Sequence, residues 1–528
     1  MHTLLPFLLA MIGAIVLLNM FAVKLKIAYP ILMVTGGLLI SFIPGLPHIR
    51  INPDLIFFIF LPPLLFASAW SISFKEMKKW WRIIGSFAFL VVFFTALSVA
   101  VVTNFAIPGF TLALGFLLGG IVSPPDAVST AAITRFVKIP RSTSAILEGE
   151  SLLNDASSLI IFRFALLAVA SGQFAWQNAA LSFVWMVLGG TGIGLIVGWL
   201  FVQIHKRLPT DASSDIALTL IEPYFMYWIA EQAHCSGVLA VVSGGLFMST
   251  RQLVFLNSAS RIQGFSFWES FVFILNGVVF LIIGLGLPEI VDGLHAQGIS
   301  LGTAIGYGVL VTGVLIVARI ISSYAAMIST LIFRPGVSPG NGANRTRQRL
   351  LMPLLLGWTG MRGVVSLAAA LAIPVTLSDG TAFPQRNLIL FVTFVAILLT
   401  LVVQGLTLPY FIRRSGLFGM VNEKPEQLVK QKIKQGLREH VHGFLKNKYE
   451  NELKNDPGME LFLKHWEEKS QAADEGWINK ESKSLLIEML EVQRVYLAEL
   501  NKDPKIDEEI IRDQLYQIDL EEERLKMI

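Results

Sequence analysis

Polar side chains that could bind an ion lie together in an otherwise apolar stretch, residues 142–170. Asp155 lies near the midpoint of this stretch, and Ser151 precedes it by one helical turn on the same face. Glu150 stands in the same relation to Asn154. A charge at the bilayer centre costs at least about 2.5–3.5 kcal/mol, so it normally lines a pathway or pairs with another charge. Because hard cations prefer oxygen ligands of these kinds, the stretch predicts a cation site on a membrane-spanning helix.

A buried ion pair that only orients helices is the alternative for each such acid. Three basic residues lie inside predicted spans, and they are Arg163, Arg319 and Arg362. Glu150 and Arg319 make a natural structural pair, so this alternative is strong for Glu150. No basic residue lies within one turn of Asp155 on its own helix, which favours a functional role for Asp155.

Three other acids lie in or near predicted spans. Hydrogen bonds between packed helices explain Glu222 and Glu231 about as well as a functional role does. Glu269 lies near a predicted membrane face, where its carboxylate can reach water.

Helix-breaking residues interrupt two of the apolar stretches. Residues 110–134 contain Ser123, two prolines and Asp126 in succession, and residues 350–375 contain the glycine-rich segment that includes Arg362. If the first six and last six predicted spans form two inverted halves, these stretches are counterparts. Paired interruptions indicate a transporter binding site at the repeat interface, whereas two kinked helices are the plainer alternative. We expect Asp126 to belong to the ion-binding residues, and Asp126 and Arg362 to balance the partial charges of the broken helix ends.

Composition places these stretches in a membrane protein. Of the 528 residues, 54% are hydrophobic and 15% are charged, and mean hydropathy is +0.63. A soluble protein of this length could not bury so much apolar surface. Since a span needs about 20 apolar residues, we predict an all-α polytopic membrane protein with about thirteen helices in two inverted repeats. The predicted spans lie near residues 4–22, 28–46, 54–72, 84–106, 110–134, 142–170, 178–204, 212–232, 235–250, 268–288, 300–332, 350–375 and 387–412.

Loop charge predicts the orientation of the spans. Alternate loops, together with the residues just after the last span, contain 19 Lys and Arg residues, against Arg50 and Arg386 in the other loops. Positively charged loops stay on the cytoplasmic side. We therefore expect the N-terminus outside and the C-terminal tail inside a plasma (inner) membrane.

The charge distribution also predicts two domains. Residues 1–414 contain 38 charged residues, whereas residues 415–528 contain the other 42. In this tail, apolar residues recur at helical spacing between Ser482 and Leu500 and again after Asp507, which is a candidate N-cap. We expect a transmembrane exchange domain, 1–414, and a mixed-charge helical cytoplasmic tail, 415–528, which is regulatory and whose ligand the sequence does not indicate.

Several motifs resemble the sodium/proton exchangers of the monovalent cation:proton antiporter-1 family. They cover most of residues 1–414 in order, and the Asn154-Asp155 element is the most specific. The matching stretches are residues 60–66, 123–128, 148–155, 234–242, 267–269, 318–320 and 361–363. Two positions depart from many family members, because Pro124 takes the place of an Asp and Ala67 that of an acid.

The resemblance implies a thirteen-span homodimer in which a mobile core moves against a dimerisation domain. Asp155 would bind either the cation or the proton, and Ser151 would be a Na⁺ ligand beside it. Ser123 would contribute from the interrupted fifth span. Asn154 would replace the second Asp of electrogenic relatives, which implies electroneutral exchange. Glu150 would pair with Arg319 to hold the core together.

These features predict a secondary antiporter that exchanges Na⁺ for H⁺ by alternating access and serves pH regulation. K⁺ and Li⁺ remain open as substrates, and a passive cation channel is the nearest alternative. An enzyme is disfavoured because the sequence has no H-E-x-x-H motif, no close Asp pair and only eight histidines. We expect no cofactor and no nucleic-acid partner, only ions, membrane lipid and a second copy of the chain.

Overall fold

The computed structural model describes residues 4–43, 53–126, 141–172, 176–333, 345–377, 380–415, 426–448, 480–504 and 506–527. Over these ranges the chain is helical apart from turns and one isolated bridge between Thr376 and Ala382. The prediction of an all-α protein is confirmed.

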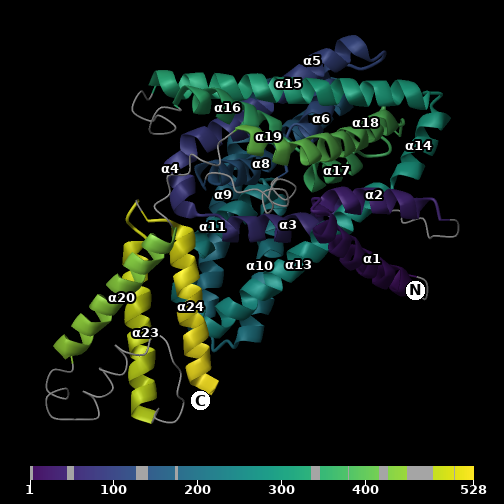
Figure 1. The fold of residues 1–528 in the computed structure, drawn as a ribbon. Coiled ribbons are helices and arrows are strands. Elements are labelled where there is room, and N and C mark those ends of the chain that lie inside the picture. Colours follow the sequence, from purple (N-terminus) through teal and green to yellow (C-terminus); the bar gives the residue numbers. More distant parts are fainter. Residues whose placement is uncertain are drawn as a thin grey trace. The chain divides into compact units, whose positions relative to one another are not determined.

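The chain divides into two compact units. Unit 1 comprises Met1–Thr210, Ser214–Phe255 and Phe267–Val421, and unit 2 comprises Asp211–Ser213, Leu256–Ser266 and Asn422–Ile528. In Figure 1 the helices are labelled and coloured by their order along the chain, from purple at the N-terminus to yellow at the C-terminus.

Most of the helices belong to unit 1, although the first residues of α10 and α13 belong to unit 2. Its first part contains α1 (Leu4–Leu25), α2 (Tyr29–Ser41), α3 (Pro53–Ser71), α4 (Phe74–Gly85), the π-helical turn η1 (Ser86–Val91), α5 (Val92–Ala106), α6 (Leu112–Val122) and α8 (Arg141–Ser171). The chain continues through α9 (Trp176–Arg207), α10 (Ala212–Gln232), α11 (Gly237–Ser249), α12 (Gln252–Phe255), α13 (Ser258–Leu285), α14 (Leu287–Ala296) and α15 (Leu301–Phe333). The last elements are α16 (Arg345–Trp358), α17 (Val364–Leu371), α18 (Arg386–Leu399), the π-helical turn η2 (Thr400–Gln404) and α19 (Gly405–Ser415).

Helix length and hydropathy agree with a protein that crosses the membrane many times. Within the described residues, seven helical segments are long and apolar enough to span a bilayer, and four shorter apolar helices accompany them. The chain is therefore a multi-pass membrane protein, while the number thirteen stays a prediction.

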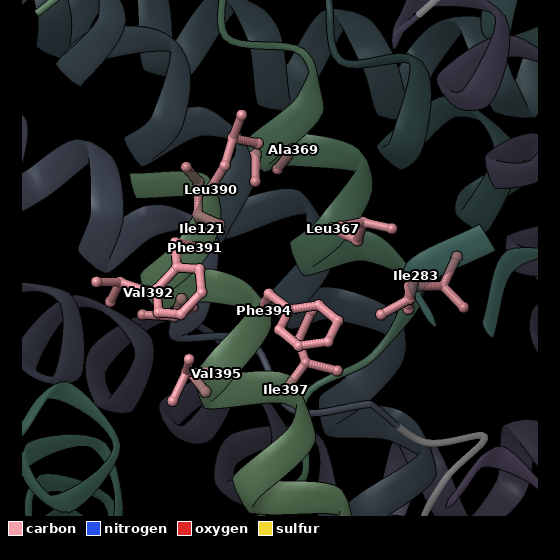
Figure 2. Close-up of a cluster of buried hydrophobic side chains, with 14 of the residues drawn as sticks. Ile121, Ile283, Leu367, Ala369, Leu390, Phe391, Val392, Phe394, Val395 and Ile397 are labelled. Atoms are coloured by element: carbon pink, nitrogen blue, oxygen red, sulfur yellow. The ribbon is translucent and has the colours of Figure 1, made fainter. Parts of the chain in front are cut away.

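Both predicted interruptions coincide with helix ends. Helix α6 ends at Val122, immediately before Ser123 and the two prolines, and residues 127–134 of this predicted span lie outside the described residues. The other interruption separates α16 from α17. Figure 2 shows the apolar packing beside them, where Ile121 of α6, Leu367 of α17 and Phe391 of α18 belong to one buried cluster. The broken segments are thus held by a packed core.

Unit 2 contains three tail helices, α20 (Glu426–Lys448), α23 (Lys480–Leu500) and α24 (Glu508–Met527). The predicted apolar face of α23 is confirmed, since Leu485 and Met489 pack against Val441 and Leu445 of α20. Asp507 is confirmed as an N-cap, because its carboxylate accepts a hydrogen bond from the Glu509 amide at 2.8 Å.

Candidate functional site

The four polar residues of α8 singled out from the sequence are all buried. Glu150 and Asn154 are fully buried, and Ser151 and Asp155 are each 8% exposed. The spacing of four residues places Ser151 and Asp155 on one helical face, as expected. Helix α8 packs against α6, α4 and η1, so these side chains lie inside the helix bundle.

Two of these side chains contact the interrupted segment after α6. The Ser151 hydroxyl donates to the Pro125 carbonyl at 3.3 Å, and the Asn154 amide nitrogen donates to the same carbonyl at 3.4 Å. This contact brings the predicted ion-binding residues of α8 next to those of residues 123–126.

Two buried oxygens at this junction have no hydrogen-bond partner among the described residues. They are the hydroxyl oxygen of Ser123 and the amide oxygen of Asn154. A buried polar atom without a partner costs about 1–3 kcal/mol, so such atoms normally have a reason to be kept. Oxygen atoms of this kind are suitable ligands for a small hard cation. The junction therefore offers oxygen atoms that a transported ion could use.

The Asp155 carboxylate has no ion pair or hydrogen bond with any of the described residues. Among the described residues, the side-chain hydrogen bond at this position reaches the backbone of Asp155, since the Ser158 hydroxyl donates to the Asp155 carbonyl at 3.0 Å. A permanent ion pair, the plain alternative to a functional role, is thus absent from the part of the chain that the structure describes.

Glu150 has the opposite environment. Arg319 of α15 donates to it through two nitrogens, Nη1 to Oε1 at 2.7 Å and Nη2 to Oε2 at 2.9 Å. Both side chains are almost fully buried. The Nε atom of Arg319 also donates to the Leu356 carbonyl in the last turn of α16, at 3.3 Å. This bidentate pair therefore joins α8 and α15 to the C-terminal end of a broken helix.

Arg362 binds the C-terminal end of the other broken helix. Its Nε donates to the Val122 carbonyl at 2.7 Å and its Nη2 donates to the Ser123 carbonyl at 3.4 Å, both at the end of α6. Its own amide donates to the Thr400 hydroxyl in η2 at 3.1 Å. Since the last carbonyls of a helix carry partial negative charge and lack helical partners, the guanidinium satisfies both needs.

Asp126 lies at the N-terminal end of α17. Its amide donates to the Met361 carbonyl at 2.7 Å, and a Cβ atom on Gly363, the residue before α17, would lie 2.2 Å from its carboxylate oxygen Oδ2. Only glycine allows this approach. The negative carboxylate at a helix N-terminus and the positive Arg362 at a helix C-terminus have the signs that the partial charges require.

Two of the remaining acids, Glu231 and Glu222, are paired. Arg163 of α8 donates through Nη2 to both oxygens of Glu231, at 2.7 and 2.6 Å, and Glu222 contacts His205 of α9. Glu269 is exposed. The sequence analysis missed His205, Asp215 and Thr400. For His205 and Asp215, a histidine at the end of an apolar span was the one signal that could have drawn attention to them. Thr400, which accepts from the Arg362 amide, had no such signal.

Comparison with known proteins adds relatives over most of the membrane unit. A family model described as "Sodium/hydrogen exchanger, transmembrane" matches residues 7–414. An uncharacterized Na(+)/H(+) exchanger of Mycobacterium tuberculosis is 32% identical over 407 residues, which cover 76% of this chain and 73% of that protein. The sodium, potassium, lithium and rubidium/H(+) antiporter of Bacillus subtilis is 34% identical over 391 residues, which cover 72% of this chain and 57% of that protein.

Among solved structures, the fold is similar to that of the sodium proton antiporter MjNhaP1 from Methanocaldococcus jannaschii. The TM-score is 0.60 at 18% sequence identity, and the match covers 78% of this chain and 99% of that one. At this identity the likeness concerns the fold alone.

Proposed function

Because the chain belongs to the sodium/hydrogen exchanger family, whose members exchange cations for protons, we propose that it exchanges one monovalent cation for one proton at Asp155. The observation that carries this proposal is the difference between the two acids of α8. Glu150 is neutralised by Arg319, whereas the Asp155 carboxylate is buried without a partner among the described residues. A buried carboxylate of this kind needs a positive ion.

The balance of buried charge supports a single positive ion. Among the described residues, the charged side chains at the two interruptions and their ion pair are three acids, Asp126, Glu150 and Asp155, and two arginines, Arg319 and Arg362. Their formal charges sum to −1. One Na⁺ or one proton on Asp155 makes the sum zero, and both together would leave an excess positive charge.

Coupling then follows from the cost of moving charge through the bilayer. A core with an empty carboxylate carries a net charge through the low-dielectric barrier, whereas a core with one cation or one proton does not. Only the loaded forms cross easily, so each crossing with a cation is matched by a return with a proton. This mechanism is alternating access with electroneutral stoichiometry.

We propose Ser151, Asn154 and Ser123 as the oxygen ligands that accompany Asp155. The unpartnered Ser123 and Asn154 oxygens and the position of Ser151 one turn from Asp155 support this set. Asp126 is proposed to line the ion site as well, and Asp126 and Arg362 set the charge of the broken helix ends. Na⁺ is the proposed substrate, and the name of the Bacillus subtilis relative makes K⁺ and Li⁺ the first alternatives to test.

The setting of the exchanger is also a proposal. The loop charges support a plasma (inner) membrane location with the N-terminus outside and the tail in the cytoplasm. We propose a homodimer with a membrane exchange domain, 1–414, and a regulatory tail, 415–528.

Purified protein in liposomes that contain a pH-sensitive dye tests this function. Addition of Na⁺, K⁺ or Li⁺ to liposomes with an imposed pH gradient should change the internal pH for transported cations only, and dissipating the membrane potential should leave the rate unchanged. Asp155→Asn should abolish the response. Retained exchange in this variant would refute the role of Asp155, and a pH change without any added cation would indicate a channel.

A further inference from the structure

A second cluster of buried titratable groups lies on α9 and α10. The His205 Nδ1 atom is 2.7 Å from Asp215 Oδ1, and its Nε2 atom is 2.9 Å from Glu222 Oε1. All three side chains are 0–2% exposed. Asp215 and Glu222 are seven residues apart, so they lie two turns apart on one face of α10 and hold the imidazole ring between them. We call His205, Asp215 and Glu222 the histidine triad.

The geometry fixes the minimum number of protons in the histidine triad. Each nitrogen-to-oxygen contact needs one proton, because a ring lone pair and a carboxylate lone pair repel each other. Two contacts therefore hold two protons, either as an imidazolium between two carboxylates or as a neutral ring beside one carboxylic acid. Both arrangements leave the triad with a net charge of −1.

Glu222 has an atom available for a third proton. Its Oε2 atom is buried and has no hydrogen-bond partner among the described residues, and His205 is the only described side chain that hydrogen-bonds to this carboxylate. Leaving a buried carboxylate oxygen bare is expensive. A third proton on the triad removes its net charge and this cost together.

Among the described residues, only Asp215 and Glu222 hydrogen-bond to the His205 ring. Helix α11 has no titratable residue, and α12 contributes the Phe255 ring, whose centroid is 5.0 Å from that of His205. Trp268 of α13 donates to the Thr219 hydroxyl of α10 at 3.2 Å. Arg261, further back on α13, is paired with Asp519, and Glu231, at the far end of α10, is paired with Arg163. The other charged residues near these helix ends are exposed, and they are Lys206, Arg207, Asp211, Arg251 and Glu269.

We propose that the histidine triad is a proton-binding site, separate from Asp155, whose occupancy controls the packing of α9 and α10 and thereby the rate of exchange. Control of the exchange rate rests on the proposed function, whereas proton binding by the triad does not. The triad lies at the end of α9 that we propose to be cytoplasmic, so it would respond to the internal proton concentration.

Two contacts connect the triad to the helix that carries Asp155. At its far end α10 bears Glu231, which binds Arg163 of α8. Helix α9 packs closely on α11 through glycines, since a Cβ on Gly194 would lie 2.1 Å from the Ala240 carbonyl oxygen, and α11 in turn packs on α8. A change in the α9–α10 packing therefore has two routes to the ion site.

Infrared difference spectroscopy on the full chain tests proton binding without any exchange. In an Asp155→Asn background, lowering the pH should produce the carbonyl band of a newly protonated carboxylic acid. The band should disappear when Glu222→Gln is added and persist when Glu269→Gln, the same change at an exposed site, is added instead. An unchanged band in the Glu222→Gln protein would overturn the site, as would the absence of any band before Glu222 is replaced. If Glu222→Gln does not give folded protein, Glu222→Asp replaces it, and the band should then shift in frequency because it comes from a different carboxyl group.

Exchange kinetics test the control of rate. Protons that compete with the cation at Asp155 change the apparent KM, whereas protons on the triad change the maximal rate at saturating cation. A proton that binds one state tenfold more tightly than another shifts their equilibrium up to about tenfold, so the wild-type maximal rate should vary with pH by up to that factor. In Glu222→Gln this variation should fall below about twofold, because the third proton can no longer bind, while the pH dependence of KM remains. A wild-type pH profile of the maximal rate in Glu222→Gln would refute rate control. Absence of all exchange in the wild type would refute the proposed function instead and leave the infrared result standing.

Discussion

Glu150 and Asp155 lie five residues apart on α8, and only Glu150 has a partner. Arg319 donates to both oxygens of Glu150, while no described residue pairs with or hydrogen-bonds to the Asp155 carboxylate. Two buried acids on one helix thus have opposite electrostatic situations. This difference separates a residue that holds the fold together from one that is available to an ion.

Stability measurements should therefore distinguish these two acids. Removal of one partner from a buried ion pair typically costs about 3–5 kcal/mol, so Glu150→Met and Arg319→Met should each lower thermal stability strongly. The double variant should recover much of the loss, because no uncompensated charge remains. Asp155→Asn should leave stability unchanged or raised, since it removes an unpaired buried charge, although exchange is lost. These effects are measured by heating purified protein and monitoring its unfolding by size-exclusion chromatography. A strong loss of stability in Asp155→Asn would contradict the assignment of Asp155 as an ion-binding rather than a structural residue.

Gly363 provides a second test, this time of the broken-helix geometry. Its replacement by alanine would place a methyl group 2.2 Å from the Asp126 carboxylate, which must then move away from the N-terminus of α17. We expect a destabilisation of about 1–3 kcal/mol and a reduced exchange rate. Gly313→Ala on α15 is the matched control, because a Cβ there has no atom within 4 Å. Equal behaviour of the two variants in unfolding and dye assays would show that the Asp126 contact is unimportant.

The sequence predicted those features that depend on composition and local pattern. Apolar length predicted the membrane helices, and the two prolines after Ser123 predicted the end of α6. The pairing of Glu150 with Arg319 was predictable because few intramembrane charges compete for partners. Packing decides the rest. Nothing in the sequence places the Arg362 guanidinium on the Val122 carbonyl, 240 residues away.

The histidine triad was missed for a related reason. His205 looks like the polar end of a span, and Asp215 looks like a solvated acid in the first turn of a helix. Their contact depends on how the chain turns between α9 and α10, and hydropathy contains no information about that turn. Arg494 shows the same limit in the tail, because charged residues within an amphipathic helix usually face water, whereas Arg494 is buried.

Buried charge in the tail leads to a third prediction. Arg494 of α23 donates to Glu491 at 3.0 Å, to Asp519 of α24 at 2.9 Å and to Glu522. Burial alone would lower the pKa of Arg494, but hydrogen bonds to Glu491 and Glu522 and the charges of Glu522 and Asp519 raise it, so the arginine stays charged. Its replacement by methionine removes the charge-assisted hydrogen bonds that join α23 to α24, while Arg261 still binds Asp519, and should destabilise the α23–α24 packing by about 1.5–3 kcal/mol.

Hydrogen exchange of the full-length protein measures this effect locally. Amides of α23 and α24 should lose protection in Arg494→Met. Arg512→Met is the control, since Arg512 makes a partly exposed pair with Glu508 one turn away, worth about 0.3–0.5 kcal/mol. If both variants retain wild-type protection, the Arg494 network does not hold these helices together. If the rate of cation/proton exchange in liposomes changes in Arg494→Met and not in Arg512→Met, this would support the proposed regulatory role of the tail.

The Arg163–Glu231 pair gives a fourth prediction, which concerns movement. Glu231 is also held by the amide of Gly237 at the start of α11, at 3.2 Å, so its carboxylate is fixed independently of Arg163. Arg163 lies on α8, eight residues after Asp155. If Asp155 serves both membrane faces in turn, α8 moves relative to α10 and α11, and this contact must break in part of the cycle. The two side chains are 39% and 28% exposed, so the pair contributes under about 1 kcal/mol to stability.

Removing the Arg163–Glu231 charge pair should therefore have a different effect from joining the same two positions by a covalent bridge. Arg163→Ala should leave thermal stability nearly unchanged while it alters the exchange rate, because one state loses a contact that the other state lacks. Arg163→Cys with Glu231→Cys, in a protein whose only native cysteine is replaced by Cys235→Ala, should lose exchange when a bifunctional thiol reagent joins the two sites. Reduction of a cleavable reagent should restore exchange, and each single cysteine variant should be insensitive. Full exchange with the bridge in place would mean that α8 and α10 move together, and the moving boundary would then have to lie elsewhere in the bundle.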